Sequence, residues 1–211
     1  MVLNLTKTKE MVFGPPYITS SLPPISASSY QIQRASEAKL LGVHVDSNLS
    51  WHAQVEAIVS KATQRLYFLK QLKRAGIPRA QLLHFYISVI RPVLEYAVPV
   101  WHHLLTKSQT DNIESVQKRA LRVIYPFSND MSYSNYLDLA DIASLSTRRN
   151  ELSRNFFFYS LVHPTSSLHS LLPPLCDPDL LGRLRAPTKF PRIPSRTKKY
   201  QSFVSDALSR Y

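Results

Sequence analysis

The sequence has little glycine, almost no cysteine and few acidic residues. Four glycines among 211 residues argue against a glycine-rich phosphate-binding loop. The single Cys176 excludes an internal disulfide framework and a cysteine-based zinc module. No apolar run reaches the ~18 residues of a membrane-spanning helix, and residues 1–14 lack the apolar run of a signal peptide. We therefore expect an intracellular protein, in the nucleus or the cytoplasm, that binds no membrane and no cofactor.

The excess of basic residues points to a polyanionic partner. Lys and Arg number 26 against 14 Asp and Glu, which gives a net charge of +12. Residues 51–126 hold 11 basic and 4 acidic side chains, and residues 177–211 hold 8 and 3. The segments 1–50 and 127–176 are nearly neutral. A charge gathered in two blocks favours nucleic acid over an acidic membrane surface as the partner, although solvated polar faces also carry such charge.

The first fifty residues predict short strands and loops. Residues 30–33 alternate polar and apolar side chains, and residues 39–46 form a second predicted strand that ends at the turn signal Asp46-Ser47-Asn48. We expect these two strands to pair as a hairpin. Residues 15–29, rich in Pro and Ser, form a connector.

From Ser50 onward the apolar spacing changes to three and four residues. Ser50 is a suitable cap for a helix that begins at Trp51 and ends at Gly76. A second helix, from Pro78 to Leu94, is apolar almost all round, which indicates the buried helix of a bundle. Pro92 and Pro99 should kink or break it. A third helix is predicted over residues 108–125.

Helices are also predicted beyond residue 126, over 137–142, 145–162 and 203–208. In the second of them, Arg148, Arg149 and Arg154 lie opposite Leu152, Phe156 and Phe157. The expected fold is α+β, mainly α: a short N-terminal β-hairpin, a helical bundle and a basic, Pro-rich tail. We divide the chain into residues 1–50 (strands), 51–126 (helical domain), 127–176 (helical extension) and 177–211 (tail).

Catalytic and metal-binding patterns are weak. His44 and Asp46 have the HxD spacing of iron- and 2-oxoglutarate-dependent oxygenases, but we favour a strand end whose Asp opens a turn. The adjacent His102 and His103 point to different sides of a helix and seldom share an ion. No serine lies in a GxSxG elbow. We predict no metal site and no self-sufficient active site.

Basic side chains beside aromatic ones suit a nucleic-acid backbone, because cations contact phosphates and rings stack on bases. The candidates on the first predicted helix are Lys61, Arg65, Lys70, Lys73 and Arg74, interleaved with Tyr67 and Phe68, and those on the third are Lys118, Arg119 and Arg122.

Four ordered motifs resemble the C-terminal part of reverse transcriptases from non-LTR (LINE-type, jockey-like) retrotransposons. Residues 4–13 (NLTKTKEMVF) resemble the NxxKT segment of the palm, and 39–46 (KLLGVHVD) with 49–51 (LSW) resemble the strand and turn that grips the primer. Residues 86–97 (YISVIRPVLEYA) resemble a thumb helix, and 113–122 (IESVQKRALR) resemble the next one. Together the four motifs span nearly the whole chain.

The resemblance implies which residues would contact nucleic acid. Leu41, Gly42, Val43 and Asp46 match the primer grip, and Lys7 matches a lysine thought to assist pyrophosphate release. The fingers and the catalytic Asp-Asp pair of the family would precede residue 1, and no such pair occurs here. We therefore expect a catalytically incomplete, non-enzymatic fragment whose thumb binds RNA or an RNA/DNA duplex weakly and in a salt-dependent way.

Two alternatives remain open. The first is a non-catalytic helical module that binds proteins or self-associates through its exposed apolar helix. The second, less favoured, rests on residues 7–13 (KTKEMVF), which resemble a short N-terminal module found beside AlkB-type RNA-modifying dioxygenases. No oxygenase core follows that segment.

Overall fold

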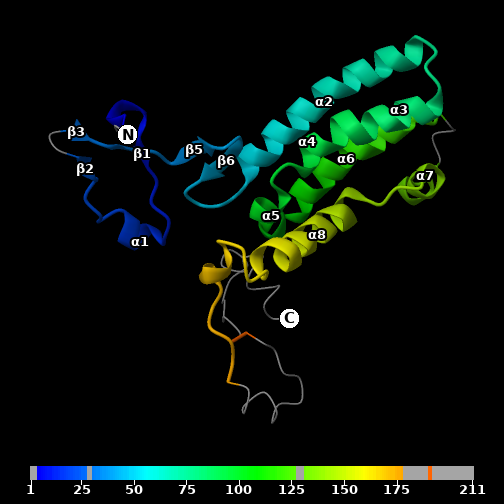
Figure 1. Ribbon diagram of the computed structural model, residues 1–211. Helices are drawn as coiled ribbons and strands as arrows, with labels where there is room; N and C mark the ends of the chain where they lie inside the picture. The colour runs from blue at the N-terminus through cyan, green and yellow to red at the C-terminus, as the bar shows by residue number, and fades with distance from the viewer. Residues whose placement is uncertain (1–3, 28–29, 127–130, 178–189, 192–211) are drawn as a thin grey trace. The chain divides into compact units, whose positions relative to one another are not determined.

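The computed structural model describes residues 4–27, 30–126, 131–177 and 190–191 (Figure 1). These residues form an α+β fold that is mainly α, as predicted. The chain divides into two compact units, residues 1–57 (unit 1) and 58–211 (unit 2), and the border lies inside the long helix α2 (His52–Arg74). The helix predicted over 203–208 lies outside the described residues.

Unit 1 holds the strands, in three separate pairs. Its other elements are a 3-10 turn η1 (Leu5–Lys7) and a short helix α1 (Pro16–Thr19). The pairs are β1 (Lys9–Glu10) parallel to β4 (Gln33–Arg34), β2 (Ser26–Ala27) antiparallel to β3 (Tyr30–Gln31), and β5 (Glu37–Leu40) antiparallel to β6 (Val43–Asp46).

The strand predicted over residues 39–46 is wrong, because the chain reverses in its middle. Leu41 and Gly42 both adopt left-handed backbone, with φ of 48° and 88°. Two consecutive residues with positive φ are what a tight hairpin turn requires, so Leu40 pairs with Val43 and Glu37 with Asp46. The predicted pairing of residues 30–33 with this segment is wrong too, because Tyr30 pairs with Ala27.

Arg34 orders the Pro- and Ser-rich connector of unit 1. Its guanidinium forms a two-pronged ion pair with Glu10, at 3.0 and 3.2 Å, and donates to the carbonyls of Leu22 and Pro23 at 3.0 Å each. The hydrogen bond with Arg34 lowers the pKa of Glu10. One side chain therefore ties β1, β4 and the connector together.

Asp46 closes the turn before α2. Its carboxylate accepts hydrogen bonds from the backbone N–H groups of Asn48, Ser50 and Trp51 and from the Ser50 hydroxyl. Trp51 has a φ of 60° and is 3% exposed, so it precedes the helix rather than beginning it as predicted. Ser50 does accept from the N–H of His52, the first helical residue.

Unit 2 is a helical bundle whose elements follow the predicted segments closely. The interval predicted as one helix, from Pro78 to Leu94, contains α3 (Arg79–Phe85), a π-helical turn η2 (Tyr86–Ile90) and α4 (Arg91–Glu95), and a separate helix α5 (Val98–Trp101) follows it. After these come η3 (His102–Leu104), α6 (Lys107–Ile124), α7 (Tyr133–Ala140), α8 (Leu145–Phe156), the π-helical η4 (Phe157–Leu161) and η5 (His169–Leu171).

Pro92 and Pro99 have different effects on the helical segment that contains them. Pro92 has no N–H to continue an α-helical ladder, and the turn before it is π-helical, with the N–H of Arg91 bonded to the carbonyl of Tyr86. The helix therefore continues through Pro92. It ends at Glu95, and Ala97, with a φ of 53°, redirects the chain into α5, whose first turn contains Pro99.

The core of unit 2 lies where α3, η2 and α4 to α6 meet. Fully buried side chains include Leu82, Tyr86, Leu94, Trp101, Ile113 and Leu121. Thr106 and Gln109 form a reciprocal capping box that begins α6, and Ser132 and Ser144 cap α7 and α8. The helices predicted over 108–125 and 145–162 are thus confirmed, and the one predicted over 137–142 begins earlier, at Tyr133.

Replacement of Asp46 by Asn tests the turn before α2. The variant loses a charged acceptor of several hydrogen bonds, so we expect the free energy of unfolding to fall by about 1 kcal/mol, measured by urea unfolding at pH 7. Partial burial by itself raises the pKa of Asp46, but the hydrogen bonds from Ser50, Asn48 and Trp51 outweigh it and lower the pKa. The difference between the two proteins should therefore shrink as the pH falls below the pKa of an unfolded aspartate and disappear once the pH is below the lowered pKa of Asp46 in the folded protein.

The matched control is Asp138→Asn, which alters an exposed carboxylate on α7. We expect that variant to unfold within about 0.5 kcal/mol of the parent. Equal stabilities of the Asp46→Asn variant and the parent at pH 7 would contradict the assigned role of Asp46.

Candidate nucleic-acid interface

Helices α2 and α6 run in the same direction, because each is antiparallel to the segment from α3 to η2. Arg65 of α2 donates to the carbonyl of Val89, while the Tyr86 hydroxyl donates to Gln117 of α6 at 2.5 Å. Leu83 packs on the cluster around Leu121, one turn beyond Gln117. Figure 1 shows the three segments side by side.

A contact between α2 and α6 aligns their charged residues. The guanidinium of Arg119 donates to the hydroxyl of Thr63 at 3.1 Å. Helical spacing then places Tyr67, Lys70 and Arg74 along the α2 side that bears Thr63, while Arg122 follows Arg119 by one turn of α6. All are exposed, with Tyr67 at 59%. We name this set, Tyr67, Lys70, Arg74, Arg119 and Arg122, the basic stripe.

The remaining predicted residues do not join the stripe. Lys61 and Arg65 lie on a different side of α2, and the guanidinium of Arg65 is committed to the Val89 carbonyl. Lys73 and Lys118 are half-buried. Lys7 lies at the end of η1 in unit 1 and is exposed. A phosphate-binding role for these five residues stays a prediction.

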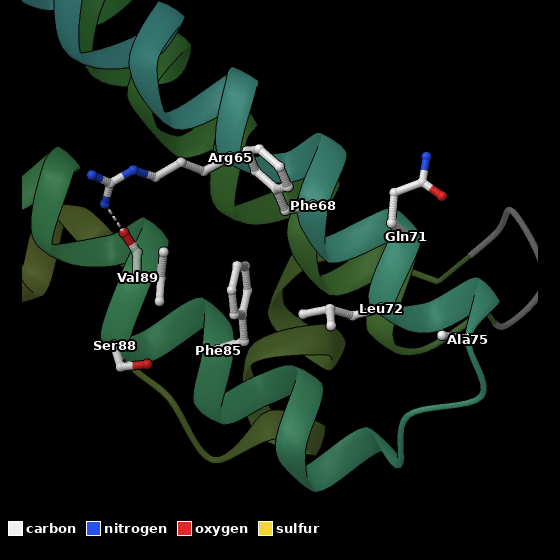
Figure 2. Close-up of a pocket in the computed structure, with 8 residues that line it drawn as sticks. All are labelled: Arg65, Phe68, Gln71, Leu72, Ala75, Phe85, Ser88 and Val89. Atoms are coloured by element: carbon white, nitrogen blue, oxygen red, sulfur yellow. Dashed lines mark hydrogen bonds between the residues drawn. The ribbon is translucent and has the colours of Figure 1, made fainter.

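A groove opens on the side of α2 that bears Arg65 (Figure 2). It has a volume of about 730 Å³, and its walls are α2 on one side and the segment from α3 to η2 on the other. The side chains that line it are Arg65, Phe68, Gln71, Leu72, Ala75, Phe85, Ser88 and Val89. The helix predicted as the buried helix of the bundle, from Pro78 to Leu94, is thus covered on its core side, but its other side lines this open groove.

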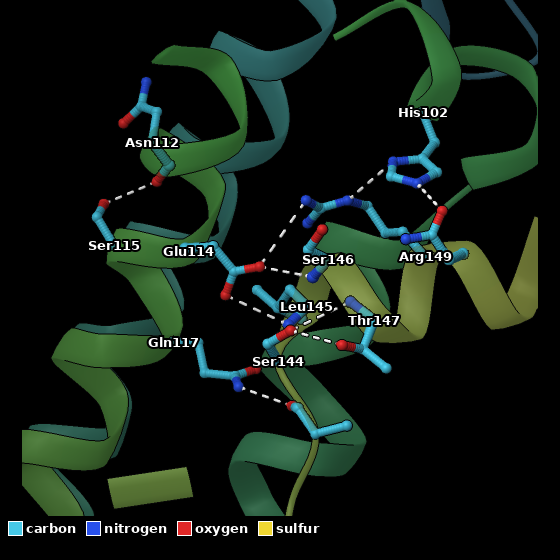
Figure 3. Close-up of polar contacts among 12 residues, drawn as sticks. His102, Asn112, Glu114, Ser115, Gln117, Ser144, Leu145, Ser146, Thr147 and Arg149 are labelled. Atoms are coloured by element: carbon cyan, nitrogen blue, oxygen red, sulfur yellow. Dashed lines mark hydrogen bonds and ion pairs between the residues drawn. The ribbon is translucent and has the colours of Figure 1, made fainter. Parts of the chain in front are cut away.

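Glu114 of α6 is the centre of a polar network (Figure 3). Its carboxylate accepts from the backbone N–H of Ser146 at 2.6 Å and of Leu145 at 3.3 Å, in the first turn of α8. The hydroxyl of Tyr133, on α7, donates to it at 2.7 Å. Burial raises the pKa of that hydroxyl, so it remains protonated and can donate. Gln117, one turn on, donates to the Ala143 carbonyl at 3.0 Å.

Arg149 is fully buried, so its predicted place opposite the apolar side of α8 is wrong. The physical reason is its partners: the guanidinium lies 3.8 Å from the Glu114 carboxylate, and its Nε donates to Nδ1 of His102 at 3.3 Å. His102 contacts Asn150 through Nε2 at 3.0 Å. Burial, opposed by the contact with Asn150 and aided by the charge of Arg149, lowers the pKa of His102 to about 4. A neutral His102 can therefore accept from Arg149 at pH 7.

A second ion pair fastens α8 to α4. Arg148 contacts both carboxylate oxygens of Glu95, at 2.5 and 3.2 Å, and Arg91 lies 3.8 Å from the same carboxylate. The hydrogen bond with Glu95 raises the pKa of Arg148. Sequence reasoning missed Glu95, Glu114 and Arg149 as a connected set, because their pairing depends on the packing of helices far apart in the sequence.

The segment that resembles a primer grip forms the β5–β6 hairpin. Leu41 and Gly42 make its exposed tip, with Leu41 86% exposed, whereas Val43 is buried and Asp46 closes the following turn. The imidazole of His44 lies 3.5 Å from the carboxylate of Glu37. The carboxylate of Asp46 does not pair with His44 as a metal ligand would, because it accepts a hydrogen bond from the hydroxyl of Ser50 within the turn. The favoured interpretation of the HxD pattern, a strand end with a turn-opening Asp, is confirmed.

Among the described residues, no group of three or more His, Cys, Asp or Glu side chains is placed to hold a metal ion. No helix in the described ranges combines the length and the apolar character that a membrane crossing needs.

Residues 51–91 match a family model described as alkylated DNA repair protein alkB homolog 8, N-terminal. The matched segment spans α2, α3 and η2, which is the helical hairpin that forms the groove. The likeness to such a module was predicted for residues 7–13, so its predicted position is wrong.

A curated protein from Drosophila melanogaster, named "Probable RNA-directed DNA polymerase from transposon BS", is 24% identical over 160 residues. The alignment covers 75% of this chain and 17% of that protein's length. No solved structure matches the chain significantly. The chain is thus distantly similar to a transposon RNA-directed DNA polymerase, which agrees with the broader part of the predicted resemblance.

Replacement of Glu114 by Gln tests the polar network. The variant keeps the size of the side chain but removes the charge beside the buried Arg149 and replaces one of the two accepting oxygens, which serve the N–H groups of Leu145 and Ser146, by an NH2 donor. We expect a loss of about 3 kcal/mol in the free energy of unfolding, because a buried charge is left without its partner.

The control for this variant is Glu151→Gln, an exposed glutamate on α8. Urea unfolding monitored by circular dichroism should place it within about 0.5 kcal/mol of the parent. A similar small effect for Glu114→Gln would show that the network does not stabilise unit 2.

Proposed function

We propose that this chain is a nucleic-acid-binding part of a LINE-type reverse transcriptase, made of the end of the palm, the thumb and a C-terminal extension. The basic stripe is the observation that carries the proposal. It supplies four exposed cations and an exposed tyrosine on two parallel helices fastened together by the contact of Arg119 with Thr63. Rigid cations contact phosphates, and an exposed ring can stack on a base.

The distant likeness to a transposon RNA-directed DNA polymerase supports this choice of partner. The order of the four motifs, from the palm-like residues 4–13 to the thumb-like 113–122, supports the narrower assignment. The ligand is RNA or an RNA/DNA duplex, recognised through its backbone and therefore with little sequence preference.

The chain by itself does not polymerise DNA in this proposal. Two-metal polymerase chemistry needs clustered carboxylates, and the sequence has no Asp-Asp pair. The carboxylates of Asp46, Glu95 and Glu114 are already occupied by backbone N–H groups or by arginines.

Salt titration of the affinity for an RNA/DNA duplex tests the binding proposal. Each phosphate contact contributes about −0.9 to the slope of log affinity against log salt for a duplex of B-DNA type. A variant with Lys70, Arg74 and Arg122 replaced by Gln should therefore bind more weakly at low salt and with a slope smaller in magnitude by about 2 to 3, measured by fluorescence anisotropy.

Arg154→Gln is the matched control, because Arg154 is an exposed arginine on α8 and does not belong to the basic stripe. Helix α8 contacts α6 at Glu114, whereas Arg119 of the stripe contacts α2. The control substitution should leave the slope unchanged. Binding of the parent that does not respond to salt would contradict the proposal.

Primer extension tests the absence of polymerase activity. The purified chain, incubated with a primed RNA template, deoxynucleotides and Mg²⁺ or Mn²⁺, should add no nucleotide, because it lacks the carboxylate pair that would hold the two metals. Extension that persists after purification over two unrelated columns would overturn this part of the proposal.

A further inference from the structure

The groove beside α2 is apolar on the inside and strongly basic around it. Seven of its eight lining residues are uncharged, and Arg65, the eighth, has its guanidinium on the Val89 carbonyl. Figure 2 shows Phe68 and Phe85 entering the groove from opposite walls. Phe68 is 58% exposed and would bury its ring in any occupant. The interior therefore favours an apolar ligand surface.

The charge of the two walls sets the sign of the ligand. Between Glu56 and Glu95 the sequence contains no acidic residue, and its basic residues are Lys61, Arg65, Lys70, Lys73, Arg74, Arg79 and Arg91. The two stretches that line the groove, residues 65–75 and 85–89, thus contain Arg65, Lys70, Lys73 and Arg74 and no acidic residue. Their summed field attracts a negatively charged partner and repels a positively charged one.

We propose that this groove binds an acidic amphipathic helix of a partner protein. The wall from Arg65 to Ala75 is about 15 Å long, which is the length of three helical turns. A helix lying in it would present apolar anchors at i, i+4 and i+7 to Phe68, Leu72 and Phe85, with its acidic side chains toward the cations of the walls.

Two other occupants fit less well. A second copy of this chain brings a charge of +12 to a surface that is already basic, so the like charges oppose self-association. A nucleic-acid strand would place its charged backbone against a lining in which seven of eight side chains are uncharged, whereas an amphipathic helix buries its apolar face there. The basic stripe, on another side of α2, offers exposed cations instead.

Tyr67 and Phe68 make the test specific, because they are adjacent and equally exposed, at 59% and 58%. Only Phe68 lines the groove, and only Tyr67 belongs to the stripe. The probe is a fluorescein-labelled helical peptide with Leu, Phe and Leu at i, i+4 and i+7 and glutamates on its opposite face. A matched peptide has lysines in place of the glutamates.

We expect the full chain to bind the acidic peptide at least about tenfold more tightly than the basic one in an anisotropy titration. Phe68→Ser should weaken that binding by about tenfold, as expected for an aromatic anchor, and Tyr67→Ser should leave it within about twofold. With an RNA/DNA duplex as the probe, the effects of the two substitutions should be reversed.

The half-buried Gln71 provides a second variant that keeps the groove filled. Gln71→Glu should weaken binding of the acidic peptide, and Gln71→Lys should strengthen it, each with unchanged circular dichroism. Equal binding of the two peptides, or insensitivity to both Phe68 and Gln71, would overturn the proposal. Loss of duplex binding in Phe68→Ser, with no peptide binding, would assign the groove to nucleic acid and overturn it as well.

Discussion

The carboxylate of Glu114 holds the helical unit together. It accepts hydrogen bonds from two backbone N–H groups in the first turn of α8 and from the hydroxyl of Tyr133 on α7. It also lies beside the buried guanidinium of Arg149, and its own helix, α6, forms part of the core. A buried arginine is tolerated only with such compensation, because removing a charge from water costs several kcal/mol. With α7 and α8 fixed to one side of α6, the side that bears Arg119 is left to contact α2.

The consequence for function is that α2 presents two different surfaces. Thr63, Tyr67, Lys70 and Arg74 follow one line of the helix, beside the cations of α6. Phe68, Leu72 and Ala75 follow another and form one wall of the groove. One surface suits phosphates and the other suits an apolar ligand, so a nucleic acid and a protein could be bound by the same helix without competing for its side chains.

Local signals predicted the long helices and failed where distant contacts decide. The spacing of the apolar residues in α6 and α8 is a local signal, and both helices are confirmed. The hairpin turn was missed because Leu41, a residue that rarely adopts positive φ, occupies a turn position. Arg149 was expected on an exposed side because nothing near it in the sequence indicates Glu114 or His102 as partners. The basic residues of the stripe were predicted by type, but their common surface depends on the packing of α6 beside α2.

Mapping where RNA contacts the protein tests the role of the basic stripe directly. A short RNA that contains 4-thiouridine, hybridised to a DNA primer, is cross-linked to the chain by long-wavelength light, and the modified peptides are identified by mass spectrometry. We expect adducts at Tyr67 and on the peptides that contain Lys70, Arg119 and Arg122. Adducts confined to the groove residues Phe68 and Phe85, or distributed over the surface without preference for α2 and α6, would contradict this role of the stripe.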